Sequence, residues 1–157
     1  MRHKKVEKRQ IEQDQKYKSI LVAKFINSLM KNGKKTVAQN VLYGAFDNLQ
    51  QKNQNALSLF EKAIQTIGPK QEVKPRRVGG ASYQIPVEVR ANRRTAIAIR
   101  WLIEAAKARS NKDYHNFSDK LAAELMDAAN EQGEAVKKRD AVHRMAQANR
   151  AFAHFKW

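Results

Sequence analysis

The chain has 157 residues, and its 31 Lys and Arg against 15 Asp and Glu give it a formal charge of +16 at pH 7. This length fits one domain, and hydrophobic residues make up 42% of it, which excludes wholesale disorder. Because there is no cysteine, disulfides and thiolate chemistry are excluded too. No apolar run is long enough to span a bilayer and no secretory signal is visible, so we expect a soluble protein inside the cell. So large a positive surplus makes nucleic acid the leading partner class.

The charge is concentrated in blocks. Residues 1–36 contain 11 basic and three acidic residues, and residues 70–100 contain eight and two. Residues 110–136 reverse the balance, with two basic and six acidic residues, and residues 137–157 return to six and one. A general solubility charge would be more evenly mixed. The blocks therefore indicate one face for a polyanion and another for solvent or protein.

Apolar residues recur at helical spacing after residue 18. We expect a flexible basic arm over residues 1–18 and a single helical domain over residues 19–157. The helices expected in the first half of that domain cover about 19–32, 36–52 and 56–67. On the second of them we expect Val37 on the buried side. The third ends at Gly68-Pro69 because proline cannot continue the hydrogen-bond ladder.

The apolar period then changes from about 3.6 to 2, which is typical of a strand. Apolar residues alternate with polar residues and a proline from Tyr83 to Val89, and the preceding run 72–78 can pair with them across the tip 79–82. We therefore predict a two-stranded β-ribbon over residues 72–90. A lone ribbon is marginally stable in water, so its strand ends should rest on the helices while its tip reaches outward.

Helical spacing returns after the ribbon, and the last helices are expected at about 92–110, 116–130 and 134–149. Asn92 is the expected cap of the first of these, and Val142 and Met145 are expected to point inward on the last. The predicted fold is thus mainly α: a single-domain bundle of about six helices with a protruding two-stranded β-ribbon between helices three and four.

Signals for catalysis are weak. The four histidines lack metal-ligand spacing and an acidic partner pattern, and no glycine-rich phosphate loop or nucleophile is visible. The acids of the fifth helix are interpreted as a solvated face rather than an acid/base pair; they are Asp119, Glu124, Asp127 and Glu131. We expect no enzyme activity, no metal site and no cofactor.

Basic side chains gather where three predicted helices begin. A helix N-terminus already carries about half a positive charge, so cations there are unfavourable unless an anion such as phosphate lies beside them. Ordinary surface charge remains the alternative for any one cluster. The fourth helix also has a basic stripe with a spacing of seven, formed by Arg93, Arg100 and Lys107. The clusters at the helix starts are Lys34-Lys35, Arg93-Arg94 and Lys137-Lys138-Arg139.

The ribbon combines guanidinium groups with an aromatic ring. Arg76 and Arg77 lie on its first strand, and Tyr83 lies near its tip. Such a finger suits an irregular or single-stranded RNA surface, where phosphates are contacted and exposed bases stack. The alternative is a structural hairpin with Tyr83 packed on the helices.

Two long motifs resemble those of ribosomal protein seven of the bacterial-type small subunit. They are EVKPRRVGGASYQIPVEVR at 72–90 and AVKKRDAVHRMAQANRAFAH at 135–154. Three short motifs continue the resemblance: MKNGKK at 30–35, AIRW at 98–101 and DAA at 127–129. The resemblance covers essentially the whole chain beyond the arm.

The resemblance implies a non-catalytic RNA-binding protein that binds the 3′ major domain of small-subunit rRNA and helps organise the head. It implies a ribosome in the cytoplasm of a bacterium or in a bacterial-type organelle, with small-subunit proteins nine, eleven and thirteen as neighbours. The rRNA-binding positions that it implies are Arg2, Lys4, Lys5, Lys8, Arg9, Lys34, Lys35, Arg76, Arg77, Arg93, Arg94, Arg100, Lys137, Lys138, Arg139, His143 and Arg144. The positions implied near exit-site tRNA and the mRNA exit path are Val78, Gly79, Gly80, Ala81, Ser82, Tyr83 and Gln84.

Three alternative functions fit the sequence less well than RNA binding. A DNA-binding module could lay one helix in a major groove, although the ribbon argues against it. A nuclease would need a metal site that the sequence does not show. A basic helix on a membrane surface would need the apolar stripes that the core already uses, so we expect no membrane partner.

Overall fold

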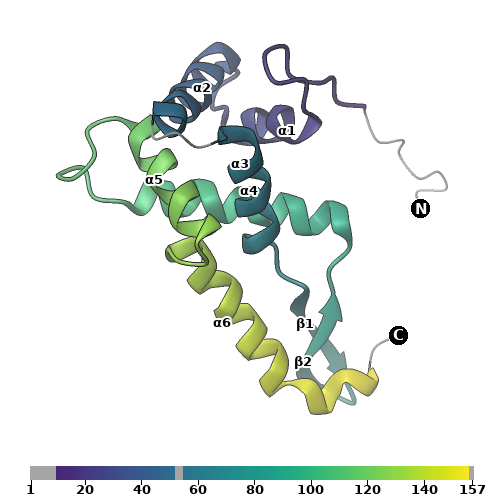
Figure 1. Ribbon diagram of the computed structural model, residues 1–157. Helices are drawn as coiled ribbons and strands as arrows, with labels where there is room; N and C mark the ends of the chain where they lie inside the picture. Colours follow the sequence, from purple (N-terminus) through teal and green to yellow (C-terminus); the bar gives the residue numbers. More distant parts are fainter. Residues whose placement is uncertain (1–9, 52–54, 156–157) are drawn as a thin grey trace.

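The computed structural model describes residues 10–51 and 55–155, and of Val78 only the backbone (Figure 1). The helices of its first half are α1 (Ile20–Leu29), α2 (Lys35–Gln51) and α3 (Ala56–Ile67). The ribbon strands are β1 (Gln71–Val78) and β2 (Ala81–Glu88). The remaining elements are α4 (Ala91–Ala108), α5 (Phe117–Ala129), α6 (Glu134–Ala148) and the 3-10 helix η1 (Arg150–Phe155). The predicted mainly helical fold, with a two-stranded ribbon between α3 and α4, is confirmed.

The core lies where α5 packs against α2, α3 and α4, and α1 closes it over α2 and α4. Phe25, Phe46 and Phe60 are fully buried there. Phe60 meets each of the other two rings edge-on at a centroid distance of 5.5 Å. Each ring contributes about 1.5–3 kcal/mol relative to an exposed position, so this cluster holds three helices from the first half of the chain together.

Two apolar side chains that were expected inside are outside. Val37 is 55% exposed and Met145 is 52% exposed. On α2 the buried row begins at Ala38, and one residue along a helix turns the side chain by about 100°. On α6 the buried positions are Ala135, Val136 and Ala146, and Met145 lines the space between α4, α6 and the ribbon.

The N-caps of α3 and α4 differ in whether a side chain caps the helix. Asn55 caps α3 by accepting a 3.3 Å hydrogen bond from the backbone N–H of Ser58. The N-cap of α4 is Arg90 rather than the expected Asn92, and Arg90 makes no side-chain capping hydrogen bond. The helix therefore begins directly after the ribbon, with Asn92 already inside its first turn.

The ribbon is antiparallel, with a register that runs from Gln71 opposite Glu88 to Val78 opposite Ala81. Its turn therefore has two residues, Gly79 and Gly80, and not the four expected. Their φ angles of +57° and +90° are costly for residues with a side chain, which explains why glycine occupies both positions.

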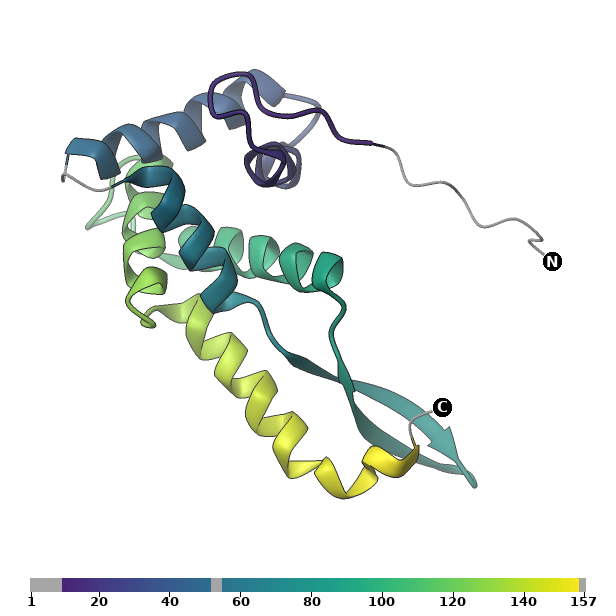
Figure 2. The ribbon, with the colours of Figure 1, turned by 45° about the vertical axis from the view of Figure 1, so that its right-hand side comes forward.

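The ribbon packs against helices along its length. Helix α6 runs beside β1 and β2, and η1 lies across β2 near the far end of the ribbon (Figure 2). Ile85 of β2 is only 2% exposed, so one face of the strand has its own apolar contact. This packing supplies the support that a two-stranded ribbon needs in water.

The packed part of the chain begins before the boundary expected at residue 18. Asp14 is 5% exposed, and its carboxylate accepts hydrogen bonds from the hydroxyl of Tyr43 at 2.8 Å and from the backbone N–H groups of Lys16 and Tyr17. Burial and this hydrogen bond raise the pKa of Tyr43 to about 12. The ring of Tyr17 packs edge-on against Phe46 at 4.9 Å. The expected arm 1–18 is therefore too long at its C-terminal end.

Candidate nucleic-acid interface

Two of the predicted RNA-binding arginines bind the protein's own backbone at the end of α3. Arg94 donates from Nε to the carbonyl of Gly68 at 2.9 Å and from a terminal nitrogen to the carbonyl of Gln65 at 3.0 Å. Arg139 donates to the carbonyl of Thr66 at 2.9 Å. The last carbonyls of a helix lack intrahelical partners and carry partial negative charge. These arginines therefore join α4 and α6 to the end of α3.

His143 holds the start of the ribbon. Its Nε2 accepts a 3.0 Å hydrogen bond from the backbone N–H of Lys70, the residue before β1. Burial and, next, the charge of Arg139 lower the pKa of His143. Both effects favour the neutral imidazole, which is the form that has a free lone pair for this bond.

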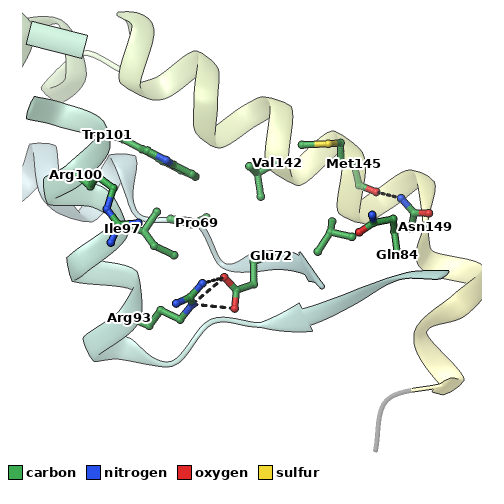
Figure 3. Close-up of a pocket in the computed structure, with 11 residues that line it drawn as sticks. Pro69, Glu72, Gln84, Arg93, Ile97, Arg100, Trp101, Val142, Met145 and Asn149 are labelled. Atoms are coloured by element: carbon green, nitrogen blue, oxygen red, sulfur yellow. Dashed lines mark hydrogen bonds and ion pairs between the residues drawn. The ribbon is translucent and has the colours of Figure 1, made fainter. Parts of the chain in front are cut away.

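Arg93 joins the start of α4 to the base of β1. Its Nε lies 2.9 Å and 2.8 Å from the two carboxylate oxygens of Glu72, and a terminal nitrogen lies 2.8 Å from one of them (Figure 3). Lys74 is a second partner of Glu72 at 3.2 Å. The hydrogen bond from Arg93 is the main cause that lowers the pKa of Glu72. The side chain of Arg93 is still 57% exposed, so it has donors left for another ligand.

The ribbon, α4 and α6 enclose a groove of about 450 Å³, which we call the ribbon groove. Its apolar wall consists of Ile97 and Trp101 on α4 and of Val142 and Met145 on α6. Figure 3 shows these side chains facing the space between the two helices and the ribbon. Arg100 of α4 is exposed at the edge of the ribbon groove. Within the described part of the chain it has no hydrogen bond or ion pair.

Other predicted contacts lie on separate parts of the surface. Arg76 and Arg77 are exposed on the outer half of β1, and Arg144 is exposed on α6. Lys34 and Lys35 are exposed at the start of α2, which packs on α1 and α5 rather than on the ribbon. None of these five side chains has a partner among residues 10–51 and 55–155. Arg2, Lys4, Lys5, Lys8 and Arg9 lie outside the described residues.

The three basic helix starts do not form one site. At the start of α6, Lys137 pairs with Glu134 at 2.6 Å and Lys138 pairs with Glu104 at 2.8 Å. Glu104 is in the second half of α4, so the start of α6 lies about 20 Å along that helix from Ala91, at a rise of about 1.5 Å per residue. Only the start of α4 lies at the ribbon groove.

The tip aromatic Tyr83 packs on the C-terminal turn. Its ring centroid is 5.1 Å from Phe152 and 5.5 Å from Phe155, both in η1. This arrangement resembles the alternative of a structural hairpin in which Tyr83 is packed. Tyr83 packs on the C-terminal turn η1, however, and not on the helical bundle. Sequence reasoning missed the two phenylalanines; their spacing of three, which places them on one face of a 3-10 helix, is the signal that was available.

The acidic segment contains a buried ionic cluster, so its interpretation as a solvated face is wrong. Glu124 is 1% exposed and lies 2.6 Å from a terminal nitrogen of Arg109, which also pairs with Asp127. The other oxygen of Glu124 accepts a hydrogen bond from the backbone N–H of Ala135 in the first turn of α6. At Gly133 a Cβ would lie 2.8 Å from this carboxylate. The cluster therefore joins the end of α4, α5 and the start of α6.

Neither a membrane-spanning helix nor a metal site is found among the described residues. No helix among them is both long enough and apolar enough to cross a membrane. Nor does any group of three or more His, Asp or Glu in residues 10–51 and 55–155 have an arrangement that could hold a metal ion.

Comparison with known proteins points to a single family. A model of the family described as "Ribosomal protein S7p/S5e" matches residues 1–150. The chain is 53% identical over 157 residues to the small ribosomal subunit protein uS7 of Anaeromyxobacter sp. (strain Fw109-5), and 53% identical to that of Beijerinckia indica subsp. indica. It is 51% identical to that of Afipia carboxidovorans. In each case 99% of both chains is covered.

Proposed function

The chain belongs to the family of ribosomal protein S7p/S5e, and on that basis we propose that it is a structural protein of the small ribosomal subunit that acts in translation by binding rRNA. More specifically, it binds the 3′ major domain and helps to organise the head of the subunit. The relatives described above come from bacteria, which supports a bacterial-type ribosome. The role is structural and requires no catalytic group.

One structural observation carries the RNA-binding part of this proposal. Arg76 and Arg77 are exposed on the outer half of β1, and Arg100 is exposed at the ribbon groove. None of the three has a partner in the described part of the chain, although the whole chain has a charge of +16. Unpaired cations in so basic a protein repel one another, and phosphate relieves that repulsion. Arginine also matches phosphate with two parallel hydrogen bonds.

The predicted positions divide into two roles. Arg94, Arg139 and His143 act through the α3–β1 junction and fix the direction of the ribbon. The others contact phosphate directly; within the described residues they are Lys34, Lys35, Arg76, Arg77, Arg93, Arg100, Lys137, Lys138 and Arg144.

The ribbon tip, residues 78–84, approaches exit-site tRNA and the mRNA exit path in this proposal. Support comes from the length of the ribbon, which carries its far end away from α1–α5 (Figure 2). A Cβ built at Gly79 or Gly80 would meet nothing within 4 Å, so the turn is open to a ligand. Small-subunit proteins nine, eleven and thirteen are the proposed protein neighbours.

A binding experiment with a transcript of the 3′ major domain tests the proposal. Arg76→Ala with Arg77→Ala should weaken binding, because two phosphate contacts are lost. Lys62→Ala with Lys112→Ala removes the same charge from exposed positions outside the ribbon and should leave binding unchanged. Equal effects of the two pairs would show that only total charge matters. Displacement of the transcript by duplex DNA would favour the DNA-binding alternative.

A further inference from the structure

The ribbon groove has one aromatic wall that the core does not fully cover. Trp101 packs against the core but is only half-buried, and it lines the groove opposite Val142 and Met145. Met145, which lines the same groove, is 52% exposed. Figure 3 shows the Trp101 ring extending from α4 toward α6. This part of the groove offers a flat, apolar ligand a surface on which to stack.

Two amide side chains lie at the other side of the groove. Gln84 of β2 is exposed, and neither end of its amide has a partner among the described residues. Asn149 donates from Nδ2 to the carbonyl of Met145 at 2.8 Å, which leaves its carbonyl oxygen as an acceptor. Together the two amides present donors and acceptors to a ligand between them and Trp101.

The charge of the groove favours an anionic ligand. Glu72 is the acid among its lining residues, and Arg93 and Lys74 already neutralise it. Arg100 has no partner in the described part of the chain, and it is adjacent to Trp101 on α4. A guanidinium beside an aromatic ring is the pair that binds a nucleotide's phosphate and base together.

We propose that the ribbon groove holds one unpaired RNA base, stacked on Trp101 with its edge toward Gln84 and Asn149 and its phosphate at Arg100. The inference rests on the proposed function and adds to it a single-base site within the rRNA interface. An unpaired base has an apolar face, polar edges and an anionic backbone, and the groove has a surface for each. A protein segment without a carboxylate would use the apolar wall but would leave Arg100 without an anion.

Fluorescence of Trp101 tests the site directly. The chain has two tryptophans, so Trp157→Phe leaves Trp101 as the single reporter. We expect a single-stranded adenosine hexamer to quench this fluorescence to saturation, because stacking brings a base against the ring. Long-chain inorganic polyphosphate has the charge but no base and should leave the emission unchanged. Equal quenching by both ligands, or none by the hexamer, would overturn the proposal.

A second measurement separates this inference from the proposed function. Trp101→Leu should weaken binding of the 3′ major domain transcript about 5- to 150-fold, the effect of one stacked base, while the salt slope stays unchanged because no phosphate contact is lost. Phe117→Leu, a half-buried core aromatic on α5, is the matched control and should bind as the parent does. If Trp101→Leu binds as tightly as the parent, the base site is wrong and the proposed function stands. If the parent does not bind the transcript, the proposed function fails.

Discussion

The backbone N–H of Lys70 donates a 3.0 Å hydrogen bond to Nε2 of His143, which joins the residue before β1 to the middle of α6. The carbonyl of Lys70 in turn accepts a hydrogen bond from the N–H of Val89 at 3.0 Å, just beyond β2. The imidazole therefore links both strands at the base of the ribbon to α6, in addition to the contact between Arg93 and Glu72. The base of the ribbon is therefore held in part by a titratable side chain whose pKa is lowered by burial.

The first prediction is that this bond makes stability depend on pH. The folded pKa of His143 is lowered, so its contribution to stability is present above the unfolded pKa of about 6.5 and is lost as pH falls through the folded value. We expect the free energy of unfolding to decrease between about pH 7.5 and about pH 5. Denaturant titrations at several pH values measure it.

His143→Gln is the control for that experiment, because glutamine accepts the same hydrogen bond and does not titrate. The lowered pKa values of Glu72 and Glu134 place their protonation below this pH window. The decrease should therefore be smaller in His143→Gln. An identical decrease in both proteins would show that the Lys70–His143 bond has no part in it.

A second prediction separates a structural arginine from a binding one on the same helix. Arg94→Met removes two hydrogen bonds to the end of α3 and should lower the free energy of unfolding by about 1.5–3 kcal/mol. Arg100→Met should change it by less than about 0.5 kcal/mol and should weaken rRNA binding instead. Urea denaturation and transcript binding of both variants measure the two effects. Equal losses of stability would contradict the assignment.

The third prediction concerns the buried ionic cluster. Glu124→Ala leaves Arg109 without its buried partner and removes the acceptor for the N–H of Ala135, so it should cost about 3–5 kcal/mol. The exposed Glu131 lies just beyond the same helix, and Glu131→Ala should change stability by less than about 0.5 kcal/mol. A loss below about 1 kcal/mol for Glu124→Ala would mean that the cluster does not join α4, α5 and α6.

The fourth prediction is that the C-terminal turn stabilises the outer half of the ribbon. Phe152→Ala with Phe155→Ala removes both aromatic contacts of Tyr83, which at about 0.5–1.5 kcal/mol per pair is enough to open a two-stranded ribbon locally. Hydrogen exchange of the β1 and β2 amides should accelerate, whereas exchange in α2 and α3 should not. Unchanged exchange in the ribbon would show that α6 alone holds it.

Much of the fold was predictable because the spacing of apolar residues along the sequence determines its helices and strands. The spacing of Phe60, Ile64 and Ile67 follows one helical face, and the helix has the bounds that the sequence predicts. The alternation from Tyr83 to Val89 likewise identifies β2. The buried Asp14 was not predictable, since its burial depends on the hydroxyl of Tyr43, 29 residues away. Burial of a polar group follows from partners that only the fold brings together.

The candidate site, like the fold, was predictable only in part. The density of cations was visible in the sequence, and with it the nature of the partner. Which cations turn inward was not visible, because Arg94 and Arg139 are held by carbonyls at the end of α3 whose position depends on how three helices pack. Glu124 is a similar case, since Arg109 reaches it only after the chain has turned back from α4 to α5.

The central claim is that phosphates of rRNA neutralise this protein's positive surface, and a salt titration of binding to the 3′ major domain transcript tests it most directly. If six to ten phosphates are neutralised, affinity should fall by about 10³–10⁵ between about 50 and about 200 mM salt, along a straight line in log–log form. An affinity that does not change with salt over that range would contradict the claim.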